Sequence, residues 1–471
     1  MNILFVEDNV AFADGIAPII RSIDHVKSLH HAVSLETATS ALEENFFDLV
    51  ILDMKIPPSD TSLDIAVEHG QRVFHLTREK TPGTPIFILT ASEPDDFALK
   101  LARFGGTHDL WGGGYETNIL DYFKKEETIE LIEKIKALAS VLHDTDSVTL
   151  NSRGRSLNLT SQQERILKVY TRRAGGVSCD IAVLNGGLSD TRVVRAVAQD
   201  DQGRTLHVCA GKLGSIEKVE EEHRAFEQHV TRLTIGTFPP KFCMIDKALT
   251  RTCGLFYTLA EGDITLFDFT AQRRGAAAGT VDKVRTSLSR WSDARSRGVC
   301  TVGDIRRHLL PDSKLESLRD KFDLDFVNDI EAETLRSSRS CIHGDLHAAN
   351  VLVRTSGDPI LIDFGDVGVG PTVLDPVTLE LSFLFHPDGV ANGQSASLSG
   401  LISSWPDIDS YLDGNPLKDI VNACRNWAHD VSGSDRDVLA SAYAYTIRQL
   451  KYETIEPSIT IELLKSICTK F

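Results

Sequence analysis

The sequence predicts two folded parts of different class: an α/β domain on a doubly wound parallel sheet, then an α+β domain of two lobes. Up to residue 140, short strands that are apolar throughout alternate with amphipathic helices, which is typical of a parallel sheet covered on both faces. A polar segment at 143–160 has no sustained apolar period and predicts a linker. From about residue 215 the pattern is mostly helical, interrupted by one strand pair within 341–366.

The elements of the first domain follow from hydrophobic periodicity. Continuous apolar runs predict strands, and apolar spacing of three and four residues predicts helices. The expected strands include 2–6, 48–52 and 85–89, and the expected helices are 11–23, 62–77, 95–104 and 126–142. In such a sheet, functional residues gather at the carboxyl ends of the strands.

Length and charge limit the class of protein. The 471 residues correspond to about three domains, or two if one is large. A hydrophobic fraction of 42% is ample for packed cores. The net charge of −17 argues against a general nucleic-acid coat or an anionic-membrane binder, since both rely on clustered Lys and Arg. Residues 1–140 hold 23 Asp and Glu against 12 Lys and Arg, so the acidity is concentrated there.

The cellular compartment is predicted from cysteine usage and from the apolar runs. Eight cysteines are scattered from Cys179 to Cys468 without Cys-x-x-Cys spacing, which favours reduced thiols over a disulfide framework or a structural zinc site. No signal peptide is visible, and no apolar run approaches the ~20 residues of a membrane helix. The expectation is a cytoplasmic protein with no membrane partner.

Acidic residues stand at the ends of the expected strands. Glu7 and Asp8 follow the first strand, Asp53 follows the strand at 48–52, and Thr90 ends the next one. If these strands are neighbours, three carboxylates meet at one sheet edge and suit Mg²⁺, which leaves room for a phosphoryl group. A carboxylate beside bound Mg²⁺ can attack a phosphoryl donor and become an aspartyl phosphate.

The segments FVEDN, VILDMKIPP and ILTAS resemble the response-regulator receiver domain, a flavodoxin-like five-stranded fold, over about residues 1–140. The resemblance implies that Asp53 is the phospho-acceptor and a metal ligand, that Glu7 and Asp8 hold Mg²⁺, and that Thr90 is the switch hydroxyl. The family's lysine normally precedes a proline after the fifth strand. Here DYFKKEE offers Lys125, or Lys124, without that proline. The implied partners are a sensor histidine kinase or phosphotransfer protein, and a second copy of the receiver.

The connecting segment has a helix and a second, looser resemblance. Ser161 with Glu164 has the capping-box pattern at the start of a helix that ends at Gly175. LTSQQERIL followed by GGVSCDIAVLNGGLSDTRVVRAV loosely resembles the helix-turn-helix output domain of many receiver proteins. Only Arg192 and Arg195 would be available to DNA, and about 270 residues would stay unexplained, so nucleic-acid binding is not the favoured reading.

A pair of motifs lies in the second half of the chain, CIHGDLHAANVLV at 341–353 and ILIDFGD at 360–366. The spacing predicts a loop carrying Asp345 and Asn350, a short strand, a turn, and a second strand ending at Asp363. These residues can supply one base and two oxygen ligands for Mg²⁺. Transfer of a phosphoryl group needs such parts, which position a hydroxyl and neutralise phosphate charge.

The two motifs resemble the aminoglycoside-phosphotransferase branch of the protein-kinase-like fold. The resemblance implies that Asp345 is the catalytic base and that Asn350 and Asp363 bind Mg²⁺. His343 and His347 would brace the loop by hydrogen bonds. The implied cofactors are ATP and Mg²⁺, and the phosphoryl acceptor is unknown.

A kinase-like fold needs a small lobe, which the preceding segment can supply. A strand at 181–184, a turn with Gly186 and Gly187, and a strand at 193–198 could cover nucleotide phosphates with backbone N–H groups. Lys212, after the next strand, fits the lysine that pairs with those phosphates. Glu222, or Glu221, on the helix at 216–230 is its expected partner.

Two further features concern the ligands. Phe256, Tyr257 and Leu259 look like a linker strand that would face an adenine. Asp375, Glu380 and Asp388 could attract a cationic acceptor, although acids on helices are more often solvated.

The sequence therefore predicts a receiver at 1–140, a linker with a helix at 141–175, and a kinase-like domain at 176–471 with lobes at about 176–262 and 263–471. The expected function is ATP-dependent phosphoryl transfer to a hydroxyl, regulated by phosphorylation of Asp53. The alternatives are a nucleotide-binding pseudokinase that acts as a scaffold and a receiver-controlled DNA-binding regulator.

Overall fold

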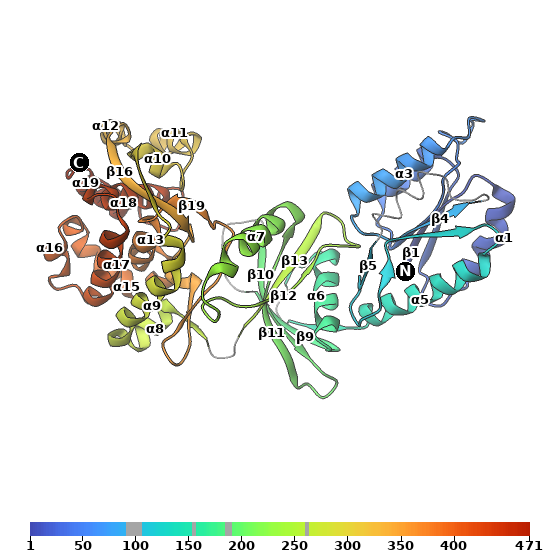
Figure 1. Ribbon diagram of the computed structural model, residues 1–471, viewed down its shortest axis with the longest axis horizontal. Coiled ribbons are helices and arrows are strands. Elements are labelled where there is room, and N and C mark those ends of the chain that lie inside the picture. Colours follow the sequence, from blue (N-terminus) through green and yellow to red (C-terminus); the bar gives the residue numbers. More distant parts are fainter. Residues whose placement is uncertain (91–105, 153–156, 184–190, 260–262) are drawn as a thin grey trace. The chain divides into compact units, whose positions relative to one another are not determined.

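The computed structural model describes residues 1–90, 106–152, 157–183, 191–259 and 263–471 (Figure 1). The chain forms two compact units. The first unit comprises 1–219 and 240–259, and the second comprises 220–239 and 260–471. This division falls inside the segment expected to form the kinase-like domain. The sheet expected to form the small lobe thus belongs to the same unit as residues 1–140. The expected domain boundaries at residues 140 and 175 stay a prediction.

The first unit begins with a five-stranded, wholly parallel sheet in the order β2-β1-β3-β4-β7. This is the doubly wound, flavodoxin-like topology that the sequence predicted. Its strands are β1 (Asn2–Val6), β2 (Ser28–Ala32), β3 (Leu49–Asp53), β4 (Ile86–Thr90) and β7 (Leu120–Lys124), and its helices are α1 (Val10–Arg21), α2 (Leu35–Glu44), α3 (Val67–Lys80) and α5 (Thr128–Asp146).

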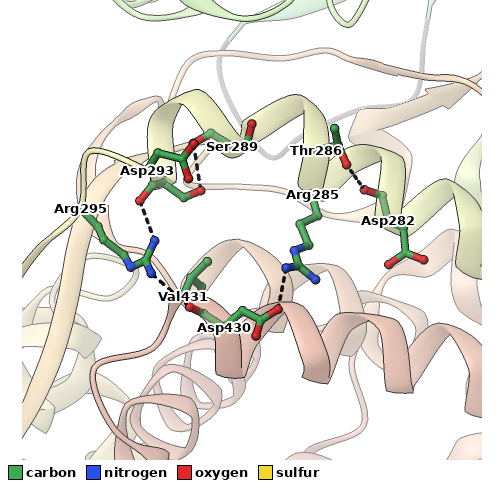
Figure 2. Close-up of a pocket in the computed structure, with 9 residues that line it drawn as sticks. Asp282, Arg285, Thr286, Ser289, Asp293, Arg295, Asp430 and Val431 are labelled. Carbon is green, nitrogen blue, oxygen red and sulfur yellow. Dashed lines mark hydrogen bonds and ion pairs between the residues drawn. The ribbon is translucent and has the colours of Figure 1, made fainter.

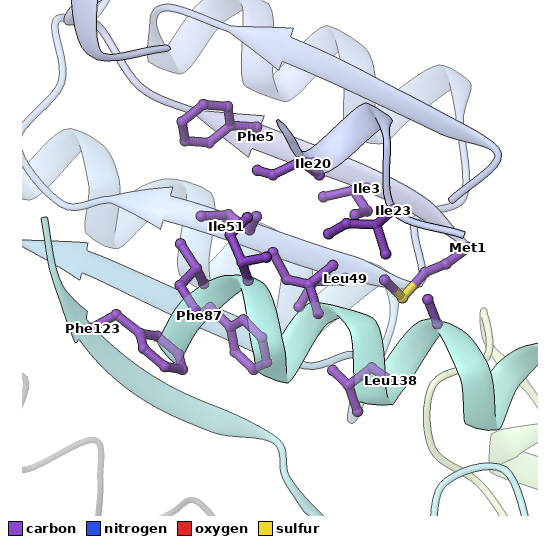
Figure 3. Packing of buried hydrophobic residues seen from close by; sticks show 14 of the residues in the cluster. Met1, Ile3, Phe5, Ile20, Ile23, Leu49, Ile51, Phe87, Phe123 and Leu138 are labelled. Carbon is purple, nitrogen blue, oxygen red and sulfur yellow. The ribbon is translucent and has the colours of Figure 1, made fainter. Parts of the chain in front are cut away.

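Apolar side chains alternate between the two faces of this sheet, because successive residues of a strand point to opposite sides. Ile3 and Phe5 join a core that α1 and α5 cover (Figure 3). Leu4 and Val6 join a second core, which α2 and α3 cover. A sheet buried on both faces explains why its strands are apolar throughout.

Two expected helices of this domain differ from the structure or cannot be compared with it. The helix expected over 62–77 begins only at Val67, because the N–H of Ala66 bonds to the carbonyl of Ile56 and keeps the preceding segment extended. The expected helix at 95–104 lies outside the described residues. The Gly-rich segment before β7 forms a hairpin of β5 (Thr107–His108) and β6 (Thr117–Asn118). Trp111, in the loop that joins these two strands, is buried.

A second sheet completes the first unit, with six strands in the order β12-β13-β11-β10-β9-β8. Residues 178–183 and 192–199 are antiparallel strands of this sheet, where a helix-turn-helix would need helices. The helix-turn-helix resemblance is therefore wrong as a fold. The strands are β8 (Thr149–Asn151), β9 (Ser178–Val183), β10 (Arg192–Gln199), β11 (Thr205–Ser215), β12 (Lys241–Ile245) and β13 (Thr252–Thr258).

Helix α6 (Ser161–Arg173) packs on this second sheet. Its capping box is formed by Thr160 and Gln163 rather than by Ser161 and Glu164, one residue earlier than predicted. The ring of Tyr170 stacks on Phe256 of β13 with 4.6 Å between centroids. The predicted helix is confirmed, and its apolar side belongs to the core of the second sheet.

The second unit is mostly helical, with two small three-stranded sheets in the orders β14-β17-β18 and β15-β16-β19. Every residue of α13 is buried, so this helix forms the centre of the unit. Among the helices of the described residues, none is long and apolar enough to cross a membrane.

The strands of the second unit are β14 (Ile264–Thr265), β15 (Ser296–Thr301), β16 (Thr334–Ile342), β17 (Val351–Val353), β18 (Pro359–Leu361) and β19 (Gly368–Pro371). The helices are α8 (Leu266–Gln272), α9 (Arg274–Ser292), α10 (Val302–Arg306), α11 (Asp312–Lys321), α12 (Asn328–Glu331), α13 (Leu374–Phe385), α14 (Pro387–Ala391), α15 (Gln394–Leu398), α16 (Ile408–Leu412), α17 (Lys418–Val431), α18 (Asp435–Gln449) and α19 (Pro457–Cys468). Helix α7 (Ile216–Gln228) begins in the first unit and ends in the second.

Candidate functional site

The three predicted carboxylates of the first domain meet at one sheet edge. Glu7 and Asp8 follow β1 and Asp53 ends β3, and these strands are direct neighbours. Each of the three residues offers one carboxylate oxygen, and these oxygens all lie within 4.8 Å of one another. Glu7 and Asp53 are buried, which places the negative charge in a poorly solvated position.

The lysine of this site is Lys125. Its Nζ lies 2.7 Å from Oε1 of Glu7 and 2.6 Å from Oδ2 of Asp53. The N–H of Lys125 donates to the carbonyl of Thr90 at 2.8 Å, so the turn after β7 is fixed to the end of β4 without the expected proline. Lys124 belongs to β7 and pairs in register with Thr90. Of the two lysines that the sequence left open, Lys125 contacts the acids.

The electrostatics of this cluster favour a bound cation. Burial raises the pKa of Glu7, and burial together with the charge of Asp53 raises that of Asp8. Burial would lower the pKa of Lys125, but its bonds to Asp53 and Glu7 outweigh that effect and raise it. Oε2 of Glu7 is buried without a hydrogen-bond partner among the described residues. A hard divalent cation such as Mg²⁺ fits this set of carboxylate oxygens.

Helix α13 supports the loop that carries Asp345 through hydrogen bonds. Strand β16 ends at Ile342, and Asp375 of α13 then accepts the backbone N–H groups of His343 and Gly344 at 2.8 and 3.0 Å. A ring nitrogen of His343 lies 3.0 Å from the carbonyl oxygen of Ile362. The predicted hydrogen bonding by His343 is thus present. Asp375, which the sequence suggested could attract a cationic acceptor, instead supports the loop.

Asn350 and Asp363 stand next to this loop. Nδ2 of Asn350 donates to the carbonyl of Asp345 at 2.9 Å, and the carbonyl of Asn350 accepts the N–H of Ile362 at 3.0 Å. Asp363 has a φ of 63°, which few residues other than glycine adopt. Such strain is common at functional sites, where the surrounding contacts maintain it. The structure therefore brings all three predicted residues of the second site together.

Two basic side chains lie near the carboxylate of Asp345. Nη1 of Arg448, in the last turn of α18, donates to Oδ1 at 3.0 Å. Nε2 of His347 lies 3.7 Å from Oδ2, beyond hydrogen-bond distance. The ring of His347 packs instead on the ring of His386, with 4.6 Å between centroids. Burial lowers the pKa of His347 to about 4, so it is neutral at pH 7.

The residues predicted to hold nucleotide lie partly outside the described chain. Gly186 and Gly187 are among the residues not described. Lys212 lies in β11, opposite Leu255 of β13. Glu222 of α7 is buried, whereas Glu221 is exposed, so Glu222 is the inward-facing acid of that helix. Lys212 and Glu222 belong to different units.

The expected cation-attracting role of the acids after residue 366 is wrong for two of them. Asp375 is buried as the brace of the loop. Glu380 is buried and bonds to Nε of Arg425 at 2.6 Å and to Nε1 of Trp405 at 2.7 Å. Both acids therefore stabilise the core. Asp388 is partly exposed, with its side chain 51% accessible.

A hollow of about 600 Å³ lies between α9 and the end of α17 (Figure 2). Its charged groups largely satisfy one another, as in the 2.6 Å ion pair of Arg285 with Asp430. None of its lining residues belongs to the two motifs. The two motifs, rather than this hollow, define the candidate site of the second unit.

Comparison with protein families identifies the region of the second site. Residues 279–392, which include Asp345, Asn350 and Asp363, match the model of the phosphotransferase enzyme family. No curated protein matches the chain.

Solved structures resemble both halves of the chain. The receiver domain of the Francisella response regulator 1452 is 20% identical, covers 30% of this chain and 96% of its own, and gives a TM-score of 0.22. Choline kinase LicA from Streptococcus pneumoniae is 15% identical over 61% of this chain and 93% of its own, with a TM-score of 0.34. A thermostable mutant of aminoglycoside phosphotransferase APH(4)-Ia, in ternary complex with ADP and hygromycin B, is 13% identical over 65% and 97%, with a TM-score of 0.37.

The class of the chain follows from its own topology and from the matched family. It has a receiver-type fold at the N-terminal end, with the strand order β2-β1-β3-β4-β7, and a phosphotransferase-family segment in the C-terminal half.

Proposed function

We propose that this chain is a two-component signalling protein in which phosphorylation of Asp53 regulates the transfer of the γ-phosphate of ATP to a hydroxyl. The observation that carries the proposal is the network of the second unit, in which Asn350 bonds to Asp345 and to the residue before Asp363. Kinase-like chemistry needs these three residue types on one loop and hairpin.

At the first site, an oxygen of Asp53 attacks the phosphorus of a phosphohistidine on a sensor histidine kinase or phosphotransfer protein. The phosphorus–nitrogen bond breaks, and the imidazole leaves with its electron pair. Lys125 lies 2.6 Å from Asp53 and can bind an oxygen of the new phosphoryl group. Glu7, Asp8 and Asp53 would hold Mg²⁺, which neutralises the phosphoryl charge during transfer.

At the second site, the acceptor hydroxyl oxygen bonds to the γ-phosphorus of ATP while the bond to the bridging oxygen breaks and ADP leaves. Asp345 takes the hydroxyl proton. Asn350 and Asp363 would hold Mg²⁺ on the phosphates, and Lys212 is proposed to pair with the nucleotide. Asp345 is suited to its role because its carbonyl and its carboxylate are each fixed by one neighbour, Asn350 and Arg448.

Helix α6 supports coupling between the first site and the phosphotransferase. Its apolar side lies in the core of the second sheet, and its basic side faces the receiver. Arg165 bonds to the buried Asp48 before β3, and Nζ of Lys168 donates to the carbonyl of Asp146 at 2.6 Å. Nη1 of Arg172 donates to the carbonyl of Val141 at 2.8 Å. The helix thus packs in the core of the second sheet and hydrogen-bonds to the receiver, both within one unit.

Arg173 connects the receiver with the second sheet. Its guanidinium donates to the carbonyl of Asp109 in the receiver at 2.7 Å and to that of Met244 in β12 at 3.0 Å. The N–H of Ala248, which follows β12, donates to the carbonyl of Pro82 at 2.9 Å. A shift of the receiver segments that hold Asp109 or Pro82 would therefore be transmitted to β12.

The catalytic assignment is tested by ATP turnover with a panel of small-molecule and protein acceptors. Wild-type protein is expected to release ADP, and Asp345→Ala is expected to lose that activity. Turnover that survives Asp345→Ala unchanged contradicts the assignment. ADP binding without turnover in wild type would favour the alternative of a nucleotide-binding scaffold.

The receiver assignment is tested separately with acetyl phosphate. Wild-type protein is expected to gain one hydroxylamine-sensitive phosphoryl group in the presence of Mg²⁺, whereas Asp53→Ala gains none. Equal labelling of both proteins rejects Asp53 as the acceptor. The role of Lys125 is tested by Lys125→Met in the same assay, with Lys124→Met as the matched control.

A further inference from the structure

Arg448 is the charged partner of the proposed catalytic base, and no sequence motif pointed to it. It lies in α18, about one hundred residues after Asp345, and the matched family segment ends before it, at residue 392. Its side chain is 16% exposed, so the contact with Asp345 is largely shielded from water. A charge-assisted hydrogen bond in such a position fixes geometry more strongly than one in bulk solvent.

Of the two basic side chains that the described residues place within 4 Å of the Asp345 carboxylate, only one is charged at neutral pH. His347 is neutral, because burial lowers its pKa to about 4. Arg448 is therefore the cation in direct contact with the Asp345 carboxylate.

The bonding of Arg448 differs from that of the structural arginines in the same unit. The guanidinium of Arg306 bonds to Glu331, Asp312 and the carbonyl of Leu310. That of Arg425 bonds to Glu380 and to the carbonyl of Trp405, and it stacks on the Trp405 ring.

Arg448 has one hydrogen bond among the described residues, the one to Asp345, and its Nε is buried without a partner. A buried donor without a partner costs free energy, so such a residue adds little to stability. A role at the active site explains its placement better than a role in the core does.

We infer that Arg448 is a positioning residue for Asp345: it holds Oδ1 and thereby presents Oδ2 to the acceptor hydroxyl. This inference rests on the proposed phosphotransferase function. The distances agree with it, since Oδ1 is 3.0 Å from Nη1 of Arg448, whereas the basic group that the described residues place nearest Oδ2 is His347, at 3.7 Å. Without Arg448 the carboxylate would rotate between orientations, and the reacting hydroxyl would lose its alignment.

The test compares full-length wild type with Arg448→Gln, Arg448→Ala and Arg448→Lys. We expect Arg448→Gln to lower the kcat of ATP turnover about 100-fold, as misplacement of a reacting group does. The KM for ATP and the Kd for ADP should stay within about twofold, because the interaction acts on the chemical step. Arg448→Lys should recover part of kcat, and guanidinium ion in the buffer should partly restore Arg448→Ala.

The matched control is Arg436→Gln. Arg436 lies on the same helix, and its guanidinium pairs with the exposed Glu333 at 3.1 Å, outside the site. Its loss should leave turnover unchanged. Thermal unfolding identifies a variant that fails to fold. A kcat within about threefold of wild type in folded Arg448→Gln or Arg448→Ala overturns the inference. If neither of them folds, a kcat of Arg448→Lys equal to that of wild type overturns it. A wild type without turnover overturns the proposed function, and the inference with it.

Discussion

The raised pKa values of Glu7 and Asp8 determine how the acidic site of the first unit responds to pH. Protons compete with a divalent cation for these carboxylates, and a raised pKa extends that competition to higher pH. We expect Mg²⁺ affinity to weaken as the pH falls through the raised pKa values of Glu7 and Asp8, above the range in which ordinary carboxylates titrate. Calorimetric titration in two buffers measures both the affinity and the protons released.

The same shifts have a stability consequence of opposite sign. Because the folded state holds these two protons more tightly than the unfolded chain does, protonation stabilises the metal-free protein. This stabilisation is complete below the unfolded pKa values of Glu7 and Asp8 and is lost as the pH rises through their raised folded-state values.

Asp8→Asn should reduce both the affinity for Mg²⁺ and the dependence of that affinity on pH. A Mg²⁺ affinity that does not change with pH in wild type would contradict the assignment.

Asp375 supports the loop that carries Asp345. It is buried and accepts two backbone N–H groups, those of His343 and Gly344. Asp375→Ala leaves both donors without a partner, so we expect a loss of about 2–4 kcal/mol in the free energy of unfolding. Urea denaturation measures it. Asp388→Ala, at a partly exposed position on α14, is the control and should change stability less.

Which site residues could be predicted depended on how local their signal is. Glu7, Asp8 and Asp53 stand at strand ends, and Asp345 and Asn350 share one motif, so spacing alone brought them together. Asp375 and Arg448 act from helices that follow later in the chain, and no local pattern shows which loop they reach. The choice between Lys125 and Lys124 needed the register of β7 with β4.

At the scale of elements, α6 depends on a close approach to β13. A Cβ built on Gly254 would lie 2.5 Å from Cγ2 of Ile166, and a contact of that length forces one element to move. Gly254→Ala should therefore destabilise the first unit by about 1–3 kcal/mol, as overpacked cores do. Thermal unfolding followed by circular dichroism measures it. Gly15→Ala in α1, where a Cβ meets nothing within 4 Å, should be neutral or stabilising. Equal effects of both substitutions would contradict this packing argument.

The sequence predicted most helices and strands but not how all of the strands pair. Strands that are apolar throughout indicated the first sheet, and the apolar period indicated α6. Residues 178–183 and 192–199 fitted both a loose helix-turn-helix pattern and a pair of strands. Their pairing in β9 and β10 decides for strands, and a single sequence does not contain that long-range information.

At the scale of the whole molecule, the proposed function has two chemistries on separate residues. The first would depend on Asp53 with Glu7 and Asp8, and the second on Asp345 with Asn350 and Asp363. No residue is shared between them. We expect Asp345→Ala to accept a phosphoryl group from acetyl phosphate as wild type does, and Asp53→Ala to keep the basal ATP turnover. Loss of both activities in either variant, with unfolding excluded by circular dichroism, would contradict this separation.

Coupling between these chemistries is the remaining prediction, and the contacts of Arg173 determine how it can be tested. Beryllofluoride, which mimics the phosphoryl group on Asp53, should change the rate of ATP turnover in wild type and leave Asp53→Ala unaffected. Arg173→Ala loses the hydrogen bonds to Asp109 and Met244, so it should bind beryllofluoride normally but show a smaller change in turnover. Arg204→Ala is the control, because Arg204 pairs with Asp200 in an exposed turn of the same sheet. A full response in Arg173→Ala would mean that the signal leaves the receiver by contacts other than those between α6 and β12.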